Sequence, residues 1–303
     1  IVAIDDAGNR SGILDDLVPA CYAPDRWIGP LSERAVDGLV HVLDAGGRPI
    51  VLGLAVGGII VARWDGTSWA SEVVGGDTAR VYRGRMDSER TTDGSTIFCA
   101  TWRPPGAGGA AFRRLDDLRE RSGGVVLGRI TPEGGVTVRD VPDTVAHAFG
   151  CGIDLSPSGS QFVLAFTGTT SAAANEIAAA PALYQCQTNA LVCSSRRVIS
   201  SAGGARLLGI DPDVLWPADS PNRWFFVGRG YGTLAVNEPV VRIEEDTIFE
   251  LEVPNSGGAV TARPVLRATR SVLTAAAVDV ISGGRLPRIV GGSIAGRTIV
   301  AIR

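Results

Sequence analysis

The sequence contains no lysine, so all 29 basic residues among its 303 are arginines. GC-rich coding in the source organism is the simplest explanation, and a surface selected for guanidinium contacts with carboxylates and aromatic rings is the alternative. Acidic and basic residues are mixed along the chain, and the formal net charge is -3. Because no basic stripe or polybasic segment occurs, we expect neither nucleic acid nor an anionic membrane as a partner.

Long apolar runs and histidines are also scarce. No apolar run reaches the length of about 18 residues that a membrane-spanning helix needs. The two histidines, His41 and His147, form no metal-type pair and belong to no Ser-His-Asp or Cys-His motif, which argues against a zinc site and against nucleophilic catalysis. The chain opens at Ile1 without methionine or the charged start of a signal peptide, so we expect a processed or trimmed product.

Turn-forming residues are abundant instead. The chain has 39 glycines and 17 prolines, whereas charged residues make up only 20% and aromatic residues 6%. This composition fits many tight turns between short strands, and it favours an all-β protein.

Apolar runs that end on glycine or alanine recur along the chain and predict buried strands. They are Pro49–Gly53, Thr96–Ala100, Gln161–Ala165, Trp224–Gly228 and Arg288–Gly291. Around the first of them, four strands are predicted at 39–43, 49–55, 59–64 and 68–74, joined by glycine-rich turns. Such a meander is the blade of a β-propeller.

The first blade resembles the repeat of secreted bacterial β-propellers. The resemblance lies in Leu43–Pro49, followed by Ala62–Trp69 with its Trp-Asp-Gly turn and the tryptophan that opens the fourth strand. It covers about 40 residues. The resemblance implies a propeller fold and an extracellular setting, and little about the ligand.

Comparable strand patterns continue to the end of the chain and predict a single domain over residues 1–303, a five-bladed β-propeller. Its blades are expected at about 33–75, 79–141, 146–200, 205–267 and 271–303 plus 1–6. The last unit has three strands, so the N-terminal strand Ile1–Ile4 is expected to complete it and to remove an exposed edge. Six blades are the alternative, if Ile13–Arg34, interpreted as a packed loop, holds further strands.

Five cysteines favour an oxidising compartment, and we expect the protein to be secreted, periplasmic or at the cell surface. Cys186 and Cys193 are spaced for a disulfide across a strand hairpin. The pairing of Cys21, Cys99 and Cys151 stays open, and one of them is left free or bonded to another chain.

Long insertions between the second and third strands of three blades mark a predicted ligand face. They are Pro104–Gly123, with a short helix expected at Phe112–Arg121, then Gly168–Pro181 and Arg229–Glu238. In a propeller these insertions and the connections between blades share one rim. The residues of this face that we expect to bind a ligand are Trp27, Trp102, Arg103, Arg113, Arg229, Tyr231 and His147. Loops that only cover the channel are the alternative.

Aspartates on the predicted innermost strands form a second group. Asp87, Asp154, Asp211 and Asp279 each follow an apolar residue there. Carboxylates around a channel can bind a metal or act as an acid and base pair. The interpretation we favour is structural, since such side chains commonly accept hydrogen bonds from the turn amides of their own hairpin.

The segment Gly209–Trp216, followed by Trp224–Gly228, resembles a blade of five-bladed arabinanase and xylosidase-like glycoside hydrolases, in which the aspartate at the place of Asp211 tunes the acid. The resemblance implies catalytic candidates Asp154, Asp211 and Asp279. The sequence departs from the family pattern, because Asp154 is not followed by proline and no glutamate lies near Asp279. The two carboxylates that flank the scissile bond are therefore in doubt.

We expect no cofactor. The alternative is Ca²⁺ at Asp5–Asp16, which is similar to a calcium loop but has Ala7 in place of the first ligand. The sequence thus favours a non-catalytic extracellular propeller that binds a protein or a glycan. A five-bladed glycoside hydrolase and a structural module of a surface assembly are the alternatives.

Overall fold

β-strands account for all the regular secondary structure in the part of the chain that the computed structural model describes. That part comprises residues 36–43, 49–55, 57–105, 122–142, 146–169, 179–199, 201–202, 205–208, 214–231, 245–269, 273–282, 285–294 and 297–302. Contacts group Arg34–Arg303 into one compact unit. The predicted N-terminal strand, packed loop, calcium loop and surface helix lie outside the described residues.

The first three groups of strands have four members each. The first is β1 (Val36–Leu43), β2 (Pro49–Ala55), β3 (Gly58–Trp64) and β4 (Trp69–Val74). The second is β5 (Val81–Arg90), β6 (Thr96–Arg103), β7 (Ser122–Ile130) and β8 (Val136–Asp140). The third is β9 (Ala146–Leu155), β10 (Gln161–Thr169), β11 (Ala179–Gln187) and β12 (Cys193–Val198).

The two remaining groups are less regular. The fourth is β13 (Ser201–Ala202), β14 (Ala205–Leu208), β15 (Val214–Leu215), β16 (Arg223–Tyr231), β17 (Glu245–Pro254) and β18 (Thr261–Thr269). The fifth is β19 (Leu273–Ser282), β20 (Arg285–Ile294) and β21 (Arg297–Ile302). In the first group the bounds lie within three residues of the four predicted strands, and β2 has the predicted bounds.

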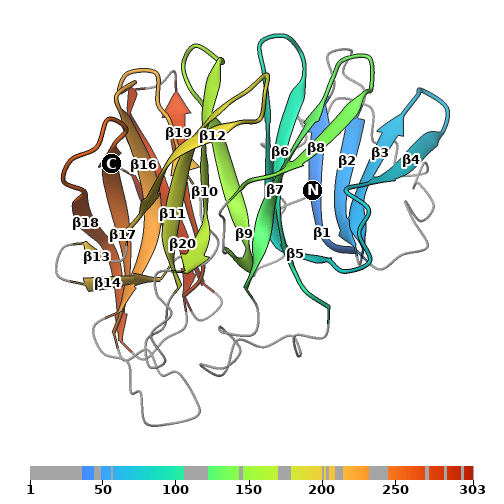
Figure 1. Ribbon diagram of the computed structural model, residues 1–303. Helices are drawn as coiled ribbons and strands as arrows, with labels where there is room; N and C mark the ends of the chain where they lie inside the picture. Colours follow the sequence, from blue (N-terminus) through green and yellow to red (C-terminus); the bar gives the residue numbers. More distant parts are fainter. Residues whose placement is uncertain are drawn as a thin grey trace. The chain divides into compact units, whose positions relative to one another are not determined.

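Within each group the strands pair antiparallel and in chain order, as blades do, except that β14 and β15 of the fourth group both pair with β16. Figure 1 follows this order by colour, from the blue first group to the red fifth. The first strand of one group adjoins the first strand of the next, β1 beside β5 and β5 beside β9. β5 and β9 are parallel, with Arg85 opposite Gly150. The fold is all-β and propeller-like.

The hydrophobic core lies between neighbouring groups, because successive residues of a central strand face opposite neighbours. Phe98 of β6 packs with Leu52 of the first group, whereas Cys99 packs with Phe162 of the third. Val163 of β10 in turn packs with Trp224 of the fourth group. Burial on both faces explains why these strands are continuously apolar rather than alternating.

The same alternation corrects the predicted equivalence of two apolar runs, Thr96–Ala100 and Gln161–Ala165. Ala100 packs toward the first group, but Ala165 packs toward the fourth, which is the next group rather than the preceding one. The two residues are therefore one position out of register with each other. When positions are matched by the neighbouring group that each side chain faces, Thr101 rather than Ala100 is the equivalent of Ala165.

Two disulfides are present among the described residues. Cys186 and Cys193 lie directly opposite each other on β11 and β12 and are bonded, as their spacing predicts. Cys99 of β6 is bonded to Cys151 of β9, so these two cysteines are not available for a bond to another chain. Cys21 lies outside the described residues.

Arginine side chains link each of the first three groups to the next by hydrogen bonds to backbone carbonyls. Arg63 of β3 donates to the Gly134 carbonyl at 2.9 Å, and Arg129 of β7 donates to the Asn189 carbonyl at 3.3 Å. Arg197 of β12 donates to the carbonyls of Pro254, at 2.8 Å, and Gly258. Every acceptor lies in the hairpin between the last two strands of the following group, with Pro254 as the last residue of β17. No helix in the described ranges is long and apolar enough to cross a membrane.

Candidate ligand-binding site

The second group has one edge at which strand ends and a connection meet. Val81 opens β5 opposite Arg103, the last residue of β6, while β7 begins at Ser122 and β8 ends at Asp140. We call this the insertion-bearing edge, since the first predicted insertion follows β6. The chain also enters from the first group here, through the turn Gly75–Arg80. Connections between blades and insertions thus share an edge, as expected.

Backbone hydrogen bonds shape the Gly75–Arg80 turn. Gly57 donates its N–H to the Arg80 carbonyl at 3.0 Å, and the Asp77 N–H donates to the Gly57 carbonyl at 3.2 Å. The Asp77 carboxylate accepts from the Ala79 N–H at 2.8 Å. Gly75 has a φ of 62°, a left-handed conformation that glycine adopts without strain. The turn therefore fixes the backbone from which Arg80 and Tyr82 extend.

Arg80 is held on three sides. Its Nε donates to Asp77 Oδ2 at 3.1 Å, and its two Nη atoms donate to the Asp140 carboxylate at 2.6 and 3.1 Å. The guanidinium also lies over the Trp102 ring, 4.3 Å from its centroid. The hydrogen bond that Arg80 donates to Asp140 is the main reason why the pKa of Arg80 is raised above its ordinary value. Arg80 is therefore a fixed cation with paired, half-exposed carboxylates.

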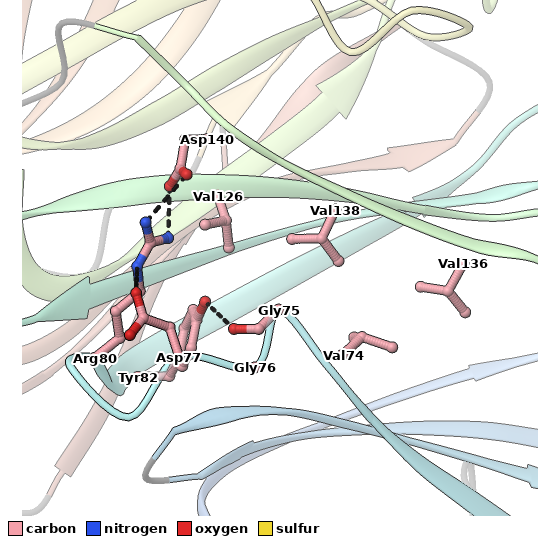
Figure 2. A pocket seen from close by; sticks show the side chains of 10 residues that line it. All are labelled: Val74, Gly75, Gly76, Asp77, Arg80, Tyr82, Val126, Val136, Val138 and Asp140. Carbon is pink, nitrogen blue, oxygen red and sulfur yellow. Dashed lines mark hydrogen bonds and ion pairs between the residues drawn. The ribbon is translucent and has the colours of Figure 1, made fainter.

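A cleft of about 400 Å³ opens beside this cluster. Figure 2 shows Arg80, Asp77 and Asp140 at one end and valines at the other. Tyr82 forms part of the wall; it is 1% exposed, and its hydroxyl donates to the Gly75 carbonyl at 3.0 Å. Burial is the main cause of the raised pKa of Tyr82, so the hydroxyl keeps its proton. The lining residues are Val74, Gly75, Gly76, Asp77, Arg80, Tyr82, Val126, Val136, Val138 and Asp140.

The Trp102 indole fits over a glycine of the neighbouring strand. Trp102 pairs with Gly124 on β7, and a Cβ at Gly124 would lie 2.8 Å from the indole Nε1. Phe98 covers Gly128 in the same way. Nε1 of Trp102 is buried and has no hydrogen-bond partner within the described part of the chain.

The structure brings together part of the predicted ligand set. Trp102 and Arg103 lie at the insertion-bearing edge, where Arg103 is buried. His147 lies at the start of β9, opposite Ser122 of β7. Arg229 and Tyr231 lie at the end of β16, before the third insertion, which is the corresponding edge of the fourth group. Trp27 and Arg113 fall outside the described residues.

The cleft residues Asp77, Arg80, Tyr82 and Asp140 were not identified from the sequence. Arg80 and Asp140 are 60 positions apart and belong to no motif. The available signal was the connection between two blades at a predicted ligand rim, which locates Asp77 and Arg80 but not their partner on β8.

Two of the innermost-strand aspartates, Asp87 and Asp154, accept hydrogen bonds from backbone N–H groups. Asp87 accepts from the N–H of Ser88 at 2.9 Å and from the N–H of Ile153 in the next group at 3.0 Å. Asp154 accepts from the N–H of Leu155 at 2.9 Å and from that of Trp216 in the fourth group. These contacts support a structural role, but the donors are the next residue of the same strand and a residue of the neighbouring group, and not turn amides of the aspartate's own hairpin.

Register separates Asp211 from the other aspartates. Asp154 pairs with Val163, and Asp279 pairs with Ile289, each two positions before the small residue of the second strand. In the fourth group that position belongs to Val214, opposite Phe226. Asp211 falls between β14 and β15, outside the described residues. Within the described ranges, no three His, Cys, Asp or Glu side chains gather in a way that could hold a metal ion.

Comparison with known proteins gives a likeness of fold. No protein-family model and no curated protein matches the chain. A solved structure of a protein of unknown function from Dyadobacter fermentans aligns with a TM-score of 0.52 at 9% identity, over 89% of this chain and 83% of the other.

Two enzymes align less well. They are a GH43_1 enzyme from Xanthomonas citri (TM-score 0.45, 10% identity, 87% of this chain and 83% of the other) and an exo-β-1,3-galactanase from Phanerochaete chrysosporium (TM-score 0.47, 13% identity, 100% and 63%). These TM-scores are too low to transfer an activity.

Proposed function

We propose that the chain is a non-catalytic, extracellular β-propeller module that binds a glycan through its insertion-bearing edge. The observation that carries the proposal is the cleft of about 400 Å³ beside the fixed Asp77–Arg80–Asp140 cluster. The carboxylates of Asp77 and Asp140 are 43% and 54% exposed. Each has oxygen lone pairs left to accept hydrogen bonds from sugar hydroxyls.

A glycan suits this surface better than a protein partner does. Among the side chains that the structure describes, the exposed large hydrophobic residues are Val73 and Val192, on different groups of strands. Specific protein interfaces usually have a buried apolar centre, and the exposed side chains of the described residues form no apolar patch that could supply one. A small, mostly polar cleft next to an aromatic ring is suited to one or two sugar residues.

Two further parts of the proposal concern the cellular compartment of the protein and the number of blades in the propeller. Two disulfides are typical of proteins from oxidising compartments, which supports secretion, the periplasm or the cell surface. Five blades, with Ile1–Ile4 completing the last, agree with the meander groups and with the three strands of the fifth. Six blades would require strands in the segment 13–34.

The test is a glycan array with the purified chain, followed by titration of the best ligand. Gly76→Leu puts a side chain into the cleft at a position where an added Cβ would meet no atom nearer than 4.0 Å, and thermal unfolding checks that the variant folds. We expect this variant to weaken binding at least about tenfold. Ala70→Leu, on the exposed face of β4, is the matched control and should bind normally. A blank array, with a protein captured instead, would contradict the glycan proposal.

A glycoside hydrolase is the second candidate, and one observation favours it. Asp87, Asp154 and Asp279 lie on innermost strands of three groups, and the last two share a register position. Hydrolysis needs two carboxylates around the bond. The backbone contacts of Asp87 and Asp154 weigh against free catalytic groups. Turnover of aryl glycosides that Asp279→Asn abolishes would establish the enzyme. A structural module would instead show neither turnover nor glycan binding.

A further inference from the structure

The Asp77–Arg80–Asp140 cluster carries one net negative charge. Two carboxylates share a single guanidinium, because Nε of Arg80 donates to Asp77 and both Nη atoms donate to Asp140. Figure 2 shows the two carboxylates on opposite sides of the guanidinium, at one end of the cleft. These three are the charged residues among those that line the cleft. The lining therefore leaves one negative charge uncompensated.

The exposed part of the cluster is its negative part. The side chains of Asp77 and Asp140 are 43% and 54% exposed, whereas the side chain of Arg80 is 21% exposed. The Trp102 ring also covers one face of the guanidinium. A ligand that enters the cleft therefore meets carboxylate oxygens before it meets the guanidinium. The carboxylate of an acidic glycan would have to displace one aspartate from Arg80 and would be repelled by the other.

The rest of the wall adds no charge. Burial raises the pKa of Tyr82, so its hydroxyl stays protonated, and that hydroxyl donates to the Gly75 carbonyl. At the other end of the cleft, Val74, Val136 and Val138 are half-buried. Their methyl groups can pack against the C–H groups of a sugar ring by dispersion. The cleft thus combines an apolar end with an end whose net charge is negative.

We infer that the cleft binds the protonated amino group of an amino sugar, with the carboxylates of Asp77 and Asp140 as acceptors. The inference rests on the proposed function and names the class of glycan. An ammonium group has three N–H donors, and its hydrogen bonds to carboxylates are charge-assisted. It uses lone pairs that Arg80 leaves free, and it neutralises the remaining negative charge. A sugar hydroxyl can donate a hydrogen bond there but leaves that charge uncompensated.

The experiment compares an oligomer of β-linked glucosamine with the glucose oligomer of the same length and linkage, by calorimetric titration at mildly acidic pH. The two differ only in an amino group in place of a hydroxyl. We expect the glucosamine oligomer to bind about fivefold or more tightly, with a difference that shrinks at high salt. A galactosamine oligomer and its neutral counterpart test the same difference on a second sugar. Equal or weaker binding of both amino forms would overturn the inference.

Spermine tests whether a cation without a sugar ring is the ligand instead. Its amino groups can reach the carboxylates, but it has no ring to pack against the valines, so we expect it to compete weakly. If spermine displaces the glucosamine oligomer at an equal concentration of amino groups, the cleft recognises a polyamine and the inference is overturned.

Variants locate the site. Asp140→Asn removes the charge and keeps an oxygen that can accept from Arg80. It should lower affinity for the glucosamine oligomer about fivefold and leave affinity for the glucose oligomer unchanged. Asp77→Asn should act in the same direction, since its side-chain oxygen can still accept from the Ala79 N–H. Asp219→Asn removes the same charge from an exposed turn of the fourth group and should bind normally.

Thermal unfolding checks that each variant folds. An equal loss in Asp219→Asn would mean that the net charge of the protein attracts the ligand, which would overturn the inference. If neutral glycans alone bind, the proposed function stands and this inference fails; if no glycan binds, both fail.

Discussion

Single carboxylates close turns in this protein. Asp65 accepts from the N–H groups of Ser68 and Thr67 and from both of their hydroxyls, and these hydrogen bonds lower its pKa. Asp93 accepts from Thr91 Oγ1 and the Ser95 N–H, and it also pairs with Arg129 at 2.6 Å. The hydroxyl of Thr91 is the main reason why the pKa of Asp93 falls to about 2.

This depressed pKa predicts a pH dependence. The contribution of Asp93 is fully present above the unfolded pKa of about 3.9 and is lost as the pH falls through about 2. Because the side chain is 54% exposed, Asp93→Asn should lower the free energy of unfolding at pH 7 by no more than about 1 kcal/mol. Urea unfolding at several pH values should show the difference shrinking below pH of about 4. A difference that grows in acid would contradict the assignment.

Residue-level prediction from sequence succeeded where the partners are local. The hairpin spacing of Cys186 and Cys193 places them opposite each other, so their disulfide was predictable. Cys99 and Cys151 are 52 positions apart, and only the packing of two groups brings them together. The aspartates of the innermost strands were predicted as backbone acceptors, but their donors in the next group had no sequence signal.

At the scale of elements, glycines inside strands leave room for the aromatic side chains on the paired strand. Gly128 of β7 is opposite Phe98, and a Cβ there would lie 1.9 Å from the ring Cζ. Phe98 is fully buried in the core between the first two groups and has no room to retreat. The glycine is therefore a packing requirement rather than a strand breaker.

Gly128→Ala should destabilise the protein by about 1 to 3 kcal/mol, the usual cost of overpacking a core. Gly76→Ala is the control, since an added Cβ there meets no atom nearer than 4.0 Å. Chemical denaturation of both variants measures the difference. Equal stability of the two would show that the ring of Phe98 moves aside at little cost.

Strand positions were largely predictable because apolar runs alternate with glycine- and aspartate-rich turns. The bulges of β5 and β9 were not, since a bulge leaves the apolar pattern of its own strand nearly unchanged and shows only in the register with its partner. For the same reason Asp211 looked equivalent to Asp154, although Val214 holds that register position.

For the whole molecule, cohesion depends on contacts between successive groups of strands. The Cys99–Cys151 disulfide crosses between the second and third groups, in the core that both share. It closes a loop of 52 residues, whereas the Cys186–Cys193 disulfide closes one of 7 within a single hairpin. Chain entropy therefore assigns the larger stabilisation to the first.

Replacing Cys99 and Cys151 by alanine should lower the free energy of unfolding by about 4 kcal/mol in the chain-entropy account. The matched pair, Cys186→Ala with Cys193→Ala, should cost about 2 to 3 kcal/mol. Denaturation in urea under non-reducing conditions compares them. If the hairpin pair lost more unfolding free energy, local strain rather than the entropy of loop closure would determine how much each disulfide stabilises the protein.

The arginine hydrogen bonds between successive groups affect which residues of the chain can vary in sequence. Arg63, Arg129 and Arg197 donate these hydrogen bonds to main-chain oxygens of the following hairpin. A hairpin that keeps its backbone path can therefore change the side chains at the acceptor positions without losing these hydrogen bonds. Divergence there leaves this link between neighbouring groups in place, whereas the side chains of the shared cores stay constrained by packing from both groups.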